Sequence, residues 1–455
     1  MIKLNYFNCI KDDYLLDGLL QTEICDNSQE KAIKNIILNK ARPMMDWLDL
    51  PFQDSDFVKE IQVYGKEISE KYENFIVLGI GGSALGAKAI KQALYTNYSP
   101  DKQNKKIKVK VIDNVDCEKF LRILQKVNIE KTMFNVVTKS GSTVEILTMF
   151  AIVLNKLKAK LGENYYKNIV VTTESTNALW NFSKQNKTKT YEVPKGVGGR
   201  YSILCPVGLL PAAVMGIDLT KLLNGARRIY NDFKNQEAGK NLCFKSALIN
   251  YKYFLKGKRE IYLLPYAHRL GKMADFYIQL LSESLGKEKT LSNGQNKLFF
   301  TPVKAKGVTY QHSLLQMFQE GPKERLFCFI NLGKHNLDIE VPKFGDENLD
   351  KYLPDTMVNL MKKEQVGCSI AYKKAGHPSY ELEIECLNEE NVGALLFYFE
   401  LTTAIMAELI NVNGYDQNGV EMQKKYTKAL IGTPGFEKEK EELSKILEGK
   451  EKFSN

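Results

Sequence analysis

The sequence predicts an α/β protein of two lobes, each a mainly parallel sheet flanked by helices, with helical N- and C-terminal extensions. Three observations lead to this fold class. The chain has 455 residues, which at ~150 residues per domain is enough for two or three domains. Hydrophobic residues make up 44% of it, so it can bury sizeable cores. Short apolar runs alternate with helical patterns along most of the chain, as in βαβ units.

The predicted elements follow this alternation in order. Residues 1–70 carry leucine and isoleucine at helical spacing and no strand signal, so we expect a helical extension there. The first lobe, residues 71–235, repeats an apolar run, a polar loop and a helix-forming segment. Its predicted strands are residues 75–80, 108–112, 134–137 and 168–171. Its predicted helices are residues 84–94, 144–157 and 177–185.

The second lobe is expected to span residues 236–412, and a helical tail is expected at residues 413–455. The predicted strands of this lobe are residues 260–264, 324–331, 369–372 and 380–384. The predicted helices of lobe and tail are residues 270–285, 390–410, 419–431 and 437–447. The long apolar helix contains Glu400 and Glu408, which make it too polar for a membrane span.

The composition argues against several classes of function. Lysine and arginine total 64 and aspartate and glutamate total 54, so the formal charge is +10. The densest basic stretch, residues 102–110, is short and has no interleaved aromatic residues, so we expect no nucleic-acid partner. The eight cysteines are scattered without a CxxC pair, which indicates reduced thiols rather than disulfides or a zinc site. Because the first residues lack the apolar segment of a signal peptide, the expected location is the cytoplasm.

Two predicted loops are suited to a phosphate group. The turn Gly81-Gly82-Ser83 places free backbone N–H groups and a hydroxyl at a helix start, where the helix dipole favours an anion. The loop 138–143 adds four hydroxyls and one ammonium group within a single turn. Serine and threonine are also favoured N-caps, but capping accounts for one hydroxyl per helix and not for four beside a lysine. These loops therefore favour a phosphate monoester.

A dinucleotide site is an alternative interpretation of the first loop. Gly79-x-Gly81-x-x-Ala84 fits the relaxed Rossmann fingerprint, which requires an acidic residue about 20 positions further on. The candidate, Asp113, stands 29 residues after Ala84. This long spacing disfavours a nicotinamide oxidoreductase, and the second hydroxyl-rich loop favours a sugar phosphate.

Six motifs resemble those of one family. In chain order, between residues 75 and 424, they are FIVLGIGGSALG, TKSGSTVE, GVGGRYS, SESLGK, QHSLLQ and DQNGVEMQK. Their order resembles that of the phosphoglucose isomerase family, in its compact bacterial form. The resemblance implies two sugar isomerase (SIS) lobes and a cytoplasmic homodimer that needs no cofactor and no metal. It also implies reversible isomerisation of glucose 6-phosphate to fructose 6-phosphate, by ring opening and proton transfer through a cis-enediol, in glycolysis and gluconeogenesis.

The resemblance further implies roles for individual residues. Glu283 would move the proton between C2 and C1, and Arg200 would stabilise the enediolate. His312, contributed by the neighbouring subunit and oriented by Glu145, would open the sugar ring together with Lys424. The residues implied in substrate binding are Gly82, Ser83, Thr138, Lys139, Ser140, Thr143, Gln279 and Gln417.

Three positions depart from the family pattern, and none removes a reactive group. Leu285 stands where asparagine is frequent, Thr138 where serine is frequent, and Gln423 where glycine is usual. A non-catalytic sugar-phosphate sensor on the same fold is the second interpretation of the motifs. Such a sensor would keep the phosphate loops and lose the base, the arginine or the ring-opening pair, whereas all four of those residues are present here.

Overall fold

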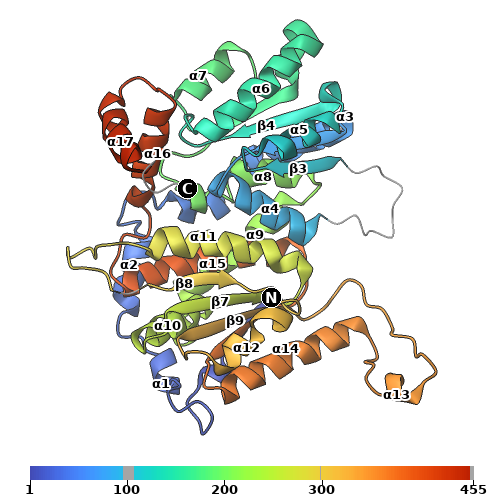
Figure 1. The fold of residues 1–455 in the computed structure, drawn as a ribbon, viewed down its shortest axis with the longest axis vertical. Coiled ribbons are helices and arrows are strands. Elements are labelled where there is room, and N and C mark those ends of the chain that lie inside the picture. The colour runs from blue at the N-terminus through green and yellow to red at the C-terminus, as the bar shows by residue number, and fades with distance from the viewer. Residues whose placement is uncertain (96–106, 298, 451–455) are drawn as a thin grey trace. The chain divides into compact units, whose positions relative to one another are not determined.

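The computed structural model describes residues 1–95, 107–297 and 299–450, so most of the basic segment 102–110 lies outside the described residues. Contacts divide the chain into two units, Met1–Gly414 and Tyr415–Asn455. The described part of the large unit holds two five-stranded sheets, each covered by helices on both faces (Figure 1). The predicted fold class, α/β with two mainly parallel sheets, is confirmed.

The first sheet is entirely parallel. In spatial order its strands are β3 (Lys108–Ile112), β2 (Asn74–Leu78), β4 (Thr132–Val137), β5 (Ile169–Thr173) and β6 (Lys189–Glu192). Every residue of β2, β4 and β5 is buried, because helices cover both faces, and these strands therefore appear in the sequence as continuous apolar runs. The edge strand β6 is short and carries two charged residues, so no sequence pattern predicts it.

Helices cover this sheet on both sides. On one side lie α5 (Cys117–Gln125), α6 (Val144–Leu161) and α7 (Ala178–Gln185), whose apolar side chains join one core cluster with Ile76, Phe134 and Val171 of the strands. On the other side lie α3 (Ser55–Lys71), α4 (Gly82–Leu94) and α8 (Pro206–Val214). The helix α4 follows β2 directly, which brings its first turn to the end of that strand.

The second sheet combines strands from distant parts of the large unit. In spatial order they are β1 (Ile2–Asn5), β10 (Ser379–Ile384), β9 (Arg325–Leu332), β7 (Glu260–Pro265) and β8 (Thr301–Lys304). All neighbours pair in parallel except β1, which runs antiparallel to β10.

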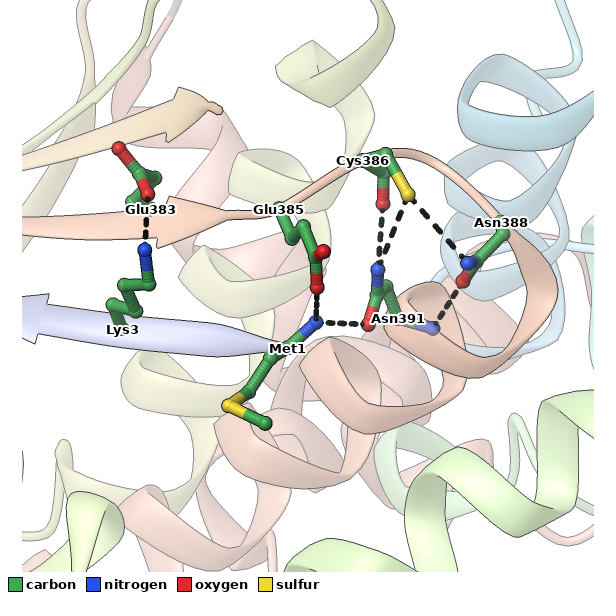
Figure 2. A network of polar contacts seen from close by, with 7 residues as sticks. All are labelled: Met1, Lys3, Glu383, Glu385, Cys386, Asn388 and Asn391. Carbon is green, nitrogen blue, oxygen red and sulfur yellow. Dashed lines mark hydrogen bonds and ion pairs between the residues drawn. The ribbon is translucent and has the colours of Figure 1, made fainter. Parts of the chain in front are cut away.

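The expectation of a purely helical N-terminal extension is wrong at β1. Figure 2 shows how this edge strand is held: the Met1 amine lies 3.0 Å from Glu385 Oε2 and 2.6 Å from Asn391 Oδ1, and Lys3 Nζ lies 3.4 Å from Glu383 Oε1. Four residues are too few to show a strand alternation, and the partner residue Glu385 stands 384 positions later. The other regular elements of this segment are helices, among them α1 (Gln21–Ile24), α2 (Glu30–Leu38) and α3, whereas residues 10–20 form turns and one isolated β-bridge.

Helices also cover both sides of the second sheet (Figure 1). On the side that faces the first sheet lie α10 (Leu242–Leu255), α11 (Gly271–Leu285) and α15 (Glu389–Leu409). On the opposite side lie α12 (Gln311–Glu320) and α14 (Met357–Lys374). Tyr262 and Leu264 of β7 pack with Phe318 of α12 and Tyr372 of α14, so alternate side chains of this strand point away from α11.

The predicted strand at residues 369–372 is wrong, because this segment belongs to α14. Cys368, Ser369 and Tyr372 are buried at helical spacing on the inner side of that helix. A run of four such residues does not distinguish a strand from the buried side of a helix. The other strands and helices predicted in this lobe match β7, β9, β10, α11 and α15 to within one residue at each end.

The helix α15 is the central core element of the large unit. By length and composition it is the one helix among the described residues that could cross a membrane, but its whole apolar window is buried inside the protein. It packs against α9 (Leu219–Asn235), α10 and α11. A methyl group on Gly225 of α9 or on Gly393 of α15 would lie 1.8 Å from a carbonyl oxygen of the other helix, so these glycines allow the close crossing.

The long segment between β9 and α14 carries one short helix, α13 (Glu347–Asp350). The small unit contains α16 (Glu421–Leu430) and α17 (Glu437–Lys450), at the positions predicted for the two tail helices. These two helices pack against each other, and the Tyr426 hydroxyl donates to Glu442 Oε1 at 3.0 Å.

Candidate active site

The strand order of the first sheet reverses between β2 and β4. These strands are parallel neighbours, so the loops that follow them meet at the same edge of the sheet. Ligands of open α/β sheets bind in the crevice at the carboxyl ends of strands where the order reverses. The two loops predicted to bind phosphate, the turn 81–83 and the loop 138–143, are the ones that lie at this point.

The loop 138–143 carries a compact group of hydroxyls. The Thr138 and Thr143 Oγ1 atoms are 2.7 Å apart, and Ser140 Oγ lies 3.5 Å from the first and 3.4 Å from the second. Ser140 is exposed and Thr143 is partly exposed, so the group is open to a ligand. The three hydroxyls together form a donor cluster suited to the oxygens of a phosphate group.

Two residues outside the predicted site brace this loop. Thr173 Oγ1 donates to the Thr138 carbonyl at 2.6 Å, and Asn177 Nδ2 donates to the Lys139 carbonyl at 3.1 Å. The Lys139 ammonium donates to the Lys195 carbonyl at 3.0 Å, and burial lowers its pKa. Its predicted contact with a phosphate stays a prediction, since in this structure the ammonium is bound to the backbone.

The last turns of α11 present an amide and a carboxylate side by side. Gln279 Nε2 donates to Glu283 Oε1 at 2.9 Å across one helical turn. The Glu283 side chain is 29% exposed, which leaves it accessible to a ligand. Gln279 Oε1 is buried and has no hydrogen-bond partner in the described part of the chain. A buried acceptor in this state is available to a hydroxyl of a bound molecule.

Arg200 is buried next to this turn, with 1% of its side chain exposed. Its Nε donates to Ser284 Oγ at 2.8 Å and its Nη2 donates to the Gly414 carbonyl at 2.6 Å. Its Nη1 lies 3.6 Å from Glu283 Oε2. Because a guanidinium keeps its proton in proteins, these contacts fix a permanent positive charge beside the carboxylate.

Two glycines bring the turn 81–83 against these groups. Gly81 has a φ of +57°, and a methyl group on it would lie 3.2 Å from Gln279 Nε2. A methyl group on Gly82 would lie 2.2 Å from the Gly199 carbonyl oxygen, next to Arg200. The turn 81–83, the arginine turn and the end of α11 are therefore in direct contact, so the structure brings these predicted residues together.

We expect Gly82→Ala to separate α4 from the arginine turn. The new methyl group would collide with backbone, which costs roughly 1–3 kcal/mol of unfolding free energy and displaces Arg200. Gly199→Ala is the matched control, because a methyl group there meets no atom within 4 Å. Denaturant unfolding should show the loss for Gly82→Ala alone. Equal stability of the two variants would contradict this contact.

Ser284 and Tyr201 hold Arg200 in place and were not predicted as site residues. The Tyr201 hydroxyl lies 3.1 Å from Ser284 Oγ, and its ring stacks on Trp47 with centroids 4.9 Å apart. Burial raises the pKa of Tyr201 to about 12, so the phenol stays protonated at neutral pH. A sequence signal for Ser284 exists: it continues the buried stripe of Met273, Tyr277 and Leu280 on α11, where a polar residue needs a partner.

His312 lies apart from this group. It is exposed on α12, which packs on the side of the second sheet opposite to α11. The sheet therefore separates His312 from Glu283 of the same chain. Glu145 is partly buried in the first turn of α6, directly after the loop 138–143.

Two further predicted residues belong to the small unit. Gln417 precedes a short 3₁₀ helix, and Lys424 lies on α16, where its Nζ is 2.8 Å from Glu421 Oε1. The Lys424 side chain is about half exposed within this unit. The roles of both residues stay predictions.

The structure disfavours the dinucleotide interpretation at Asp113. This residue follows β3, and its carboxylate pairs with the ammonium group of Lys88 on α4. A carboxylate that binds a ribose hydroxyl would have to face the ligand crevice instead.

Comparison with known proteins identifies the family. The model of the phosphoglucose isomerase family matches residues 55–443. A glucose-6-phosphate isomerase of Carboxydothermus hydrogenoformans is 36% identical over 450 residues, which cover 97% of this chain and 97% of that protein. The chain belongs to the phosphoglucose isomerase family. The resemblance seen in the six motifs is thereby confirmed.

Solved structures show the same fold. A hypothetical protein of Thermus thermophilus superposes with a TM-score of 0.85 at 32% identity, covering 95% of this chain and 100% of that one. A glucose-6-phosphate isomerase of Chlamydia trachomatis superposes with a TM-score of 0.81 at 20% identity, covering 98% and 92%. The two-sheet architecture is thus shared with a protein of low sequence identity.

Proposed function

We propose that this protein interconverts glucose 6-phosphate and fructose 6-phosphate. The observation that carries the proposal is the grouping of Glu283, Gln279 and Arg200 against the turn 81–83. The hydroxyl-rich loop 138–143 follows the neighbouring parallel strand at the same edge of the sheet. Membership of the phosphoglucose isomerase family and the relative named glucose-6-phosphate isomerase support the same reaction.

Isomerisation of an aldose to a ketose moves one proton from C2 to C1 and one hydroxyl proton from O2 to O1. Glu283 removes the proton from C2 of the open-chain sugar, which leaves a negative charge on O1 and forms a planar cis-enediolate. Protonation of O1 gives the cis-enediol, and loss of the O2 hydroxyl proton accompanies the return of a proton to C1. The same carboxylate returns a proton to C1 on the same face, as the glutamate of triosephosphate isomerase does on another fold. Gln279 donates to Glu283 Oε1 and so holds the carboxylate in one orientation. A general base of this kind accelerates a reaction about 10²–10⁴-fold.

Arg200 stabilises the negative charge that develops on the enediolate oxygens. Ser284 and the Gly414 carbonyl fix its guanidinium before the substrate arrives, so little reorganisation is needed in the transition state. One preorganised donor to a developing oxyanion contributes roughly 10²–10³ in turnover. Its position beside Glu283 puts the positive charge on the side where the proton is removed.

The phosphate group of the substrate binds at the ends of β2 and β4. The hydroxyls of Ser83, Thr138, Ser140 and Thr143 are its donors, with Lys139 as an added cation. The dipole of α4, which starts at Gly82, favours the negative charge. Binding energy from this remote group positions C1 and C2 at the carboxylate.

We further propose a homodimer in which the partner subunit's His312 completes the site. The separation of α12 from α11 by the second sheet supports this arrangement, since the chain's own histidine lies on the far side. An imidazole changes its charge near neutral pH and can donate a proton to the ring oxygen. Glu145 would orient this imidazole, Lys424 would assist ring opening, and Gln417 would line the pocket.

Mixing two inactive variants tests the shared site. Glu283→Gln and His312→Ala chains, denatured and refolded together in equal amounts, should recover about one quarter of the wild-type activity. Half of the dimers are then mixed, and each mixed dimer has one site with both native residues. Each variant refolded alone is the control and should stay inactive. No recovery in the mixture, with mixed dimers present by native mass spectrometry, would contradict a histidine shared between subunits.

The reaction itself is tested by assaying fructose 6-phosphate formed from glucose 6-phosphate by the purified full-length chain. We expect conversion without an added cofactor or metal, and a cytoplasmic location, in keeping with eight scattered cysteines. Absence of conversion by the folded protein would overturn the proposed function.

A further inference from the structure

A cavity lies at the end of the helix pair α4 and α11 that is opposite to the candidate active site. Its volume is about 420 Å³, within the range of about 300–1,000 Å³ of small-molecule sites. The end of α4, the start of α11 and the residues just before α11 form its walls. The basic residues that line it are Lys88, Lys91, His268, Arg269 and Lys272.

The positive charge of this cavity is only partly neutralised. Lys88 pairs with Asp113, and Lys272 Nζ lies 2.7 Å from Asp275 Oδ2. Within residues 1–95, 107–297 and 299–450, no carboxylate lies within ion-pair distance of the other two cations, Lys91 and Arg269. Among the described residues, two cations of this cavity therefore have no acidic side chain that balances their charge.

Both of these cations are partly buried in the cavity wall. Arg269 donates to the Ala93 carbonyl, and its Nε is buried without a hydrogen-bond partner in the described part of the chain. Burial and the neighbouring Lys110 and Lys88 lower the pKa of Lys91, and burial lowers the pKa of Arg269. Crowded cations of this kind gain from a bound anion, which relieves their mutual repulsion.

We propose that this cavity binds a small phosphate-bearing anion with at least two negative charges. Lysine offers a compact charge, and arginine offers planar paired donors that match phosphate oxygens. His268 Nε2 lies 3.1 Å from Gln92 Nε2 at the edge of the cavity, and Gln92 Oε1 accepts from the Lys272 backbone N–H at 2.7 Å. These contacts keep the start of α11 beside the end of α4, so the cationic groups come from both lobes.

The cavity is separate from the site for the sugar phosphate. At 1.5 Å per helical residue, Lys91 lies ~12 Å along α4 from Ser83, and Lys272 lies ~16 Å along α11 from Glu283. One phosphate group does not span these distances. A ligand here would contact both helices that carry the candidate active site and would leave the hydroxyl-rich loop empty.

Pyrophosphate binding to the full-length protein tests the proposal, by isothermal titration calorimetry. Lys91→Met removes one cation from the cavity, and Lys139→Met alters the phosphate loop of the candidate active site. Lys59→Met is the matched control, because Lys59 is an exposed lysine that lines a different cavity, of about 470 Å³. Lys91→Arg keeps the charge and shows whether a loss comes from charge or from misfolding.

We expect Lys91→Met to weaken one pyrophosphate site about tenfold or more, the cost of one charge-assisted hydrogen bond. Lys59→Met and Lys91→Arg should bind like the wild type, and Lys139→Met should keep the Lys91-dependent site. Pyrophosphate binding that is unchanged in Lys91→Met would overturn the proposal. So would the complete loss of pyrophosphate binding in Lys139→Met, because all of it would then occur at the candidate active site. Neither outcome depends on isomerase activity, so this test and that of the proposed function fail independently.

Discussion

Glu283→Gln is expected to reduce turnover about 10²–10⁴-fold while the affinity for the sugar phosphate stays within about tenfold. The amide has nearly the same shape, and its oxygen can still accept the hydrogen bond from Gln279 Nε2. The phosphate loop is unaffected, so ground-state binding remains. What is lost is the group that accepts a proton from carbon. Steady-state kinetics in both directions, with KM and kcat separated, measure this loss.

The matched control for this variant is Glu288→Gln, which makes the same change of charge at an exposed position five residues later. It should leave kcat within about twofold of the wild type, as expected for a surface substitution. Full activity of Glu283→Gln would remove Glu283 from the role of base.

Arg200→Lys is expected to lower kcat/KM by about 10²–10³, although it conserves the charge. A lysine lacks the planar, forked donors of a guanidinium. It cannot donate hydrogen bonds to Ser284 Oγ, the Gly414 carbonyl and the enediolate at the same time. Each buried acceptor left without its donor also costs roughly 1–3 kcal/mol of stability. The loss of activity should therefore be accompanied by a lower midpoint of denaturant unfolding.

Arg227→Lys is the control that separates a loss of catalysis from a loss of stability. Arg227 is half-buried and its Nε also donates to a backbone carbonyl, that of Pro51, at 2.6 Å. This control should lose stability and keep kcat/KM when assayed far below its unfolding midpoint. If both variants keep full activity, Arg200 does not act on the enediolate.

The parts of the fold that were predictable depend on local spacing. Buried parallel strands form continuous apolar runs, so β2, β4 and β5 are visible in the sequence. Gln279 and Glu283 are one helical turn apart, so the helical geometry alone places their side chains next to each other. The shared position of the turn 81–83 and the loop 138–143 was also predictable. Each follows a strand pattern and precedes a helix pattern, and neighbouring parallel strands end at the same edge of a sheet.

The contacts that position the site depend on distant residues and leave little local signal. Ser284 accepts from Arg200, 84 positions earlier, and the Gly414 carbonyl accepts from the same guanidinium 214 positions away. β1 is a strand because β10 offers it an edge, and a segment of 4 residues shows no alternation. The segment 369–372 has the composition of a strand, yet packing on the second sheet makes it part of α14.

In the proposed mechanism one carboxylate transfers a proton between two adjacent carbons, while the turn 81–83 and the hydroxyl-rich loop 138–143 hold the distant phosphate. A crystal structure of the protein with an open-chain hexitol 6-phosphate measures this geometry. We expect the phosphate on Ser83 and the loop 138–143, and the Glu283 carboxylate ~3–3.5 Å from C1 and C2. A phosphate bound elsewhere, or another side chain at those carbons with Glu283 out of reach, would contradict it.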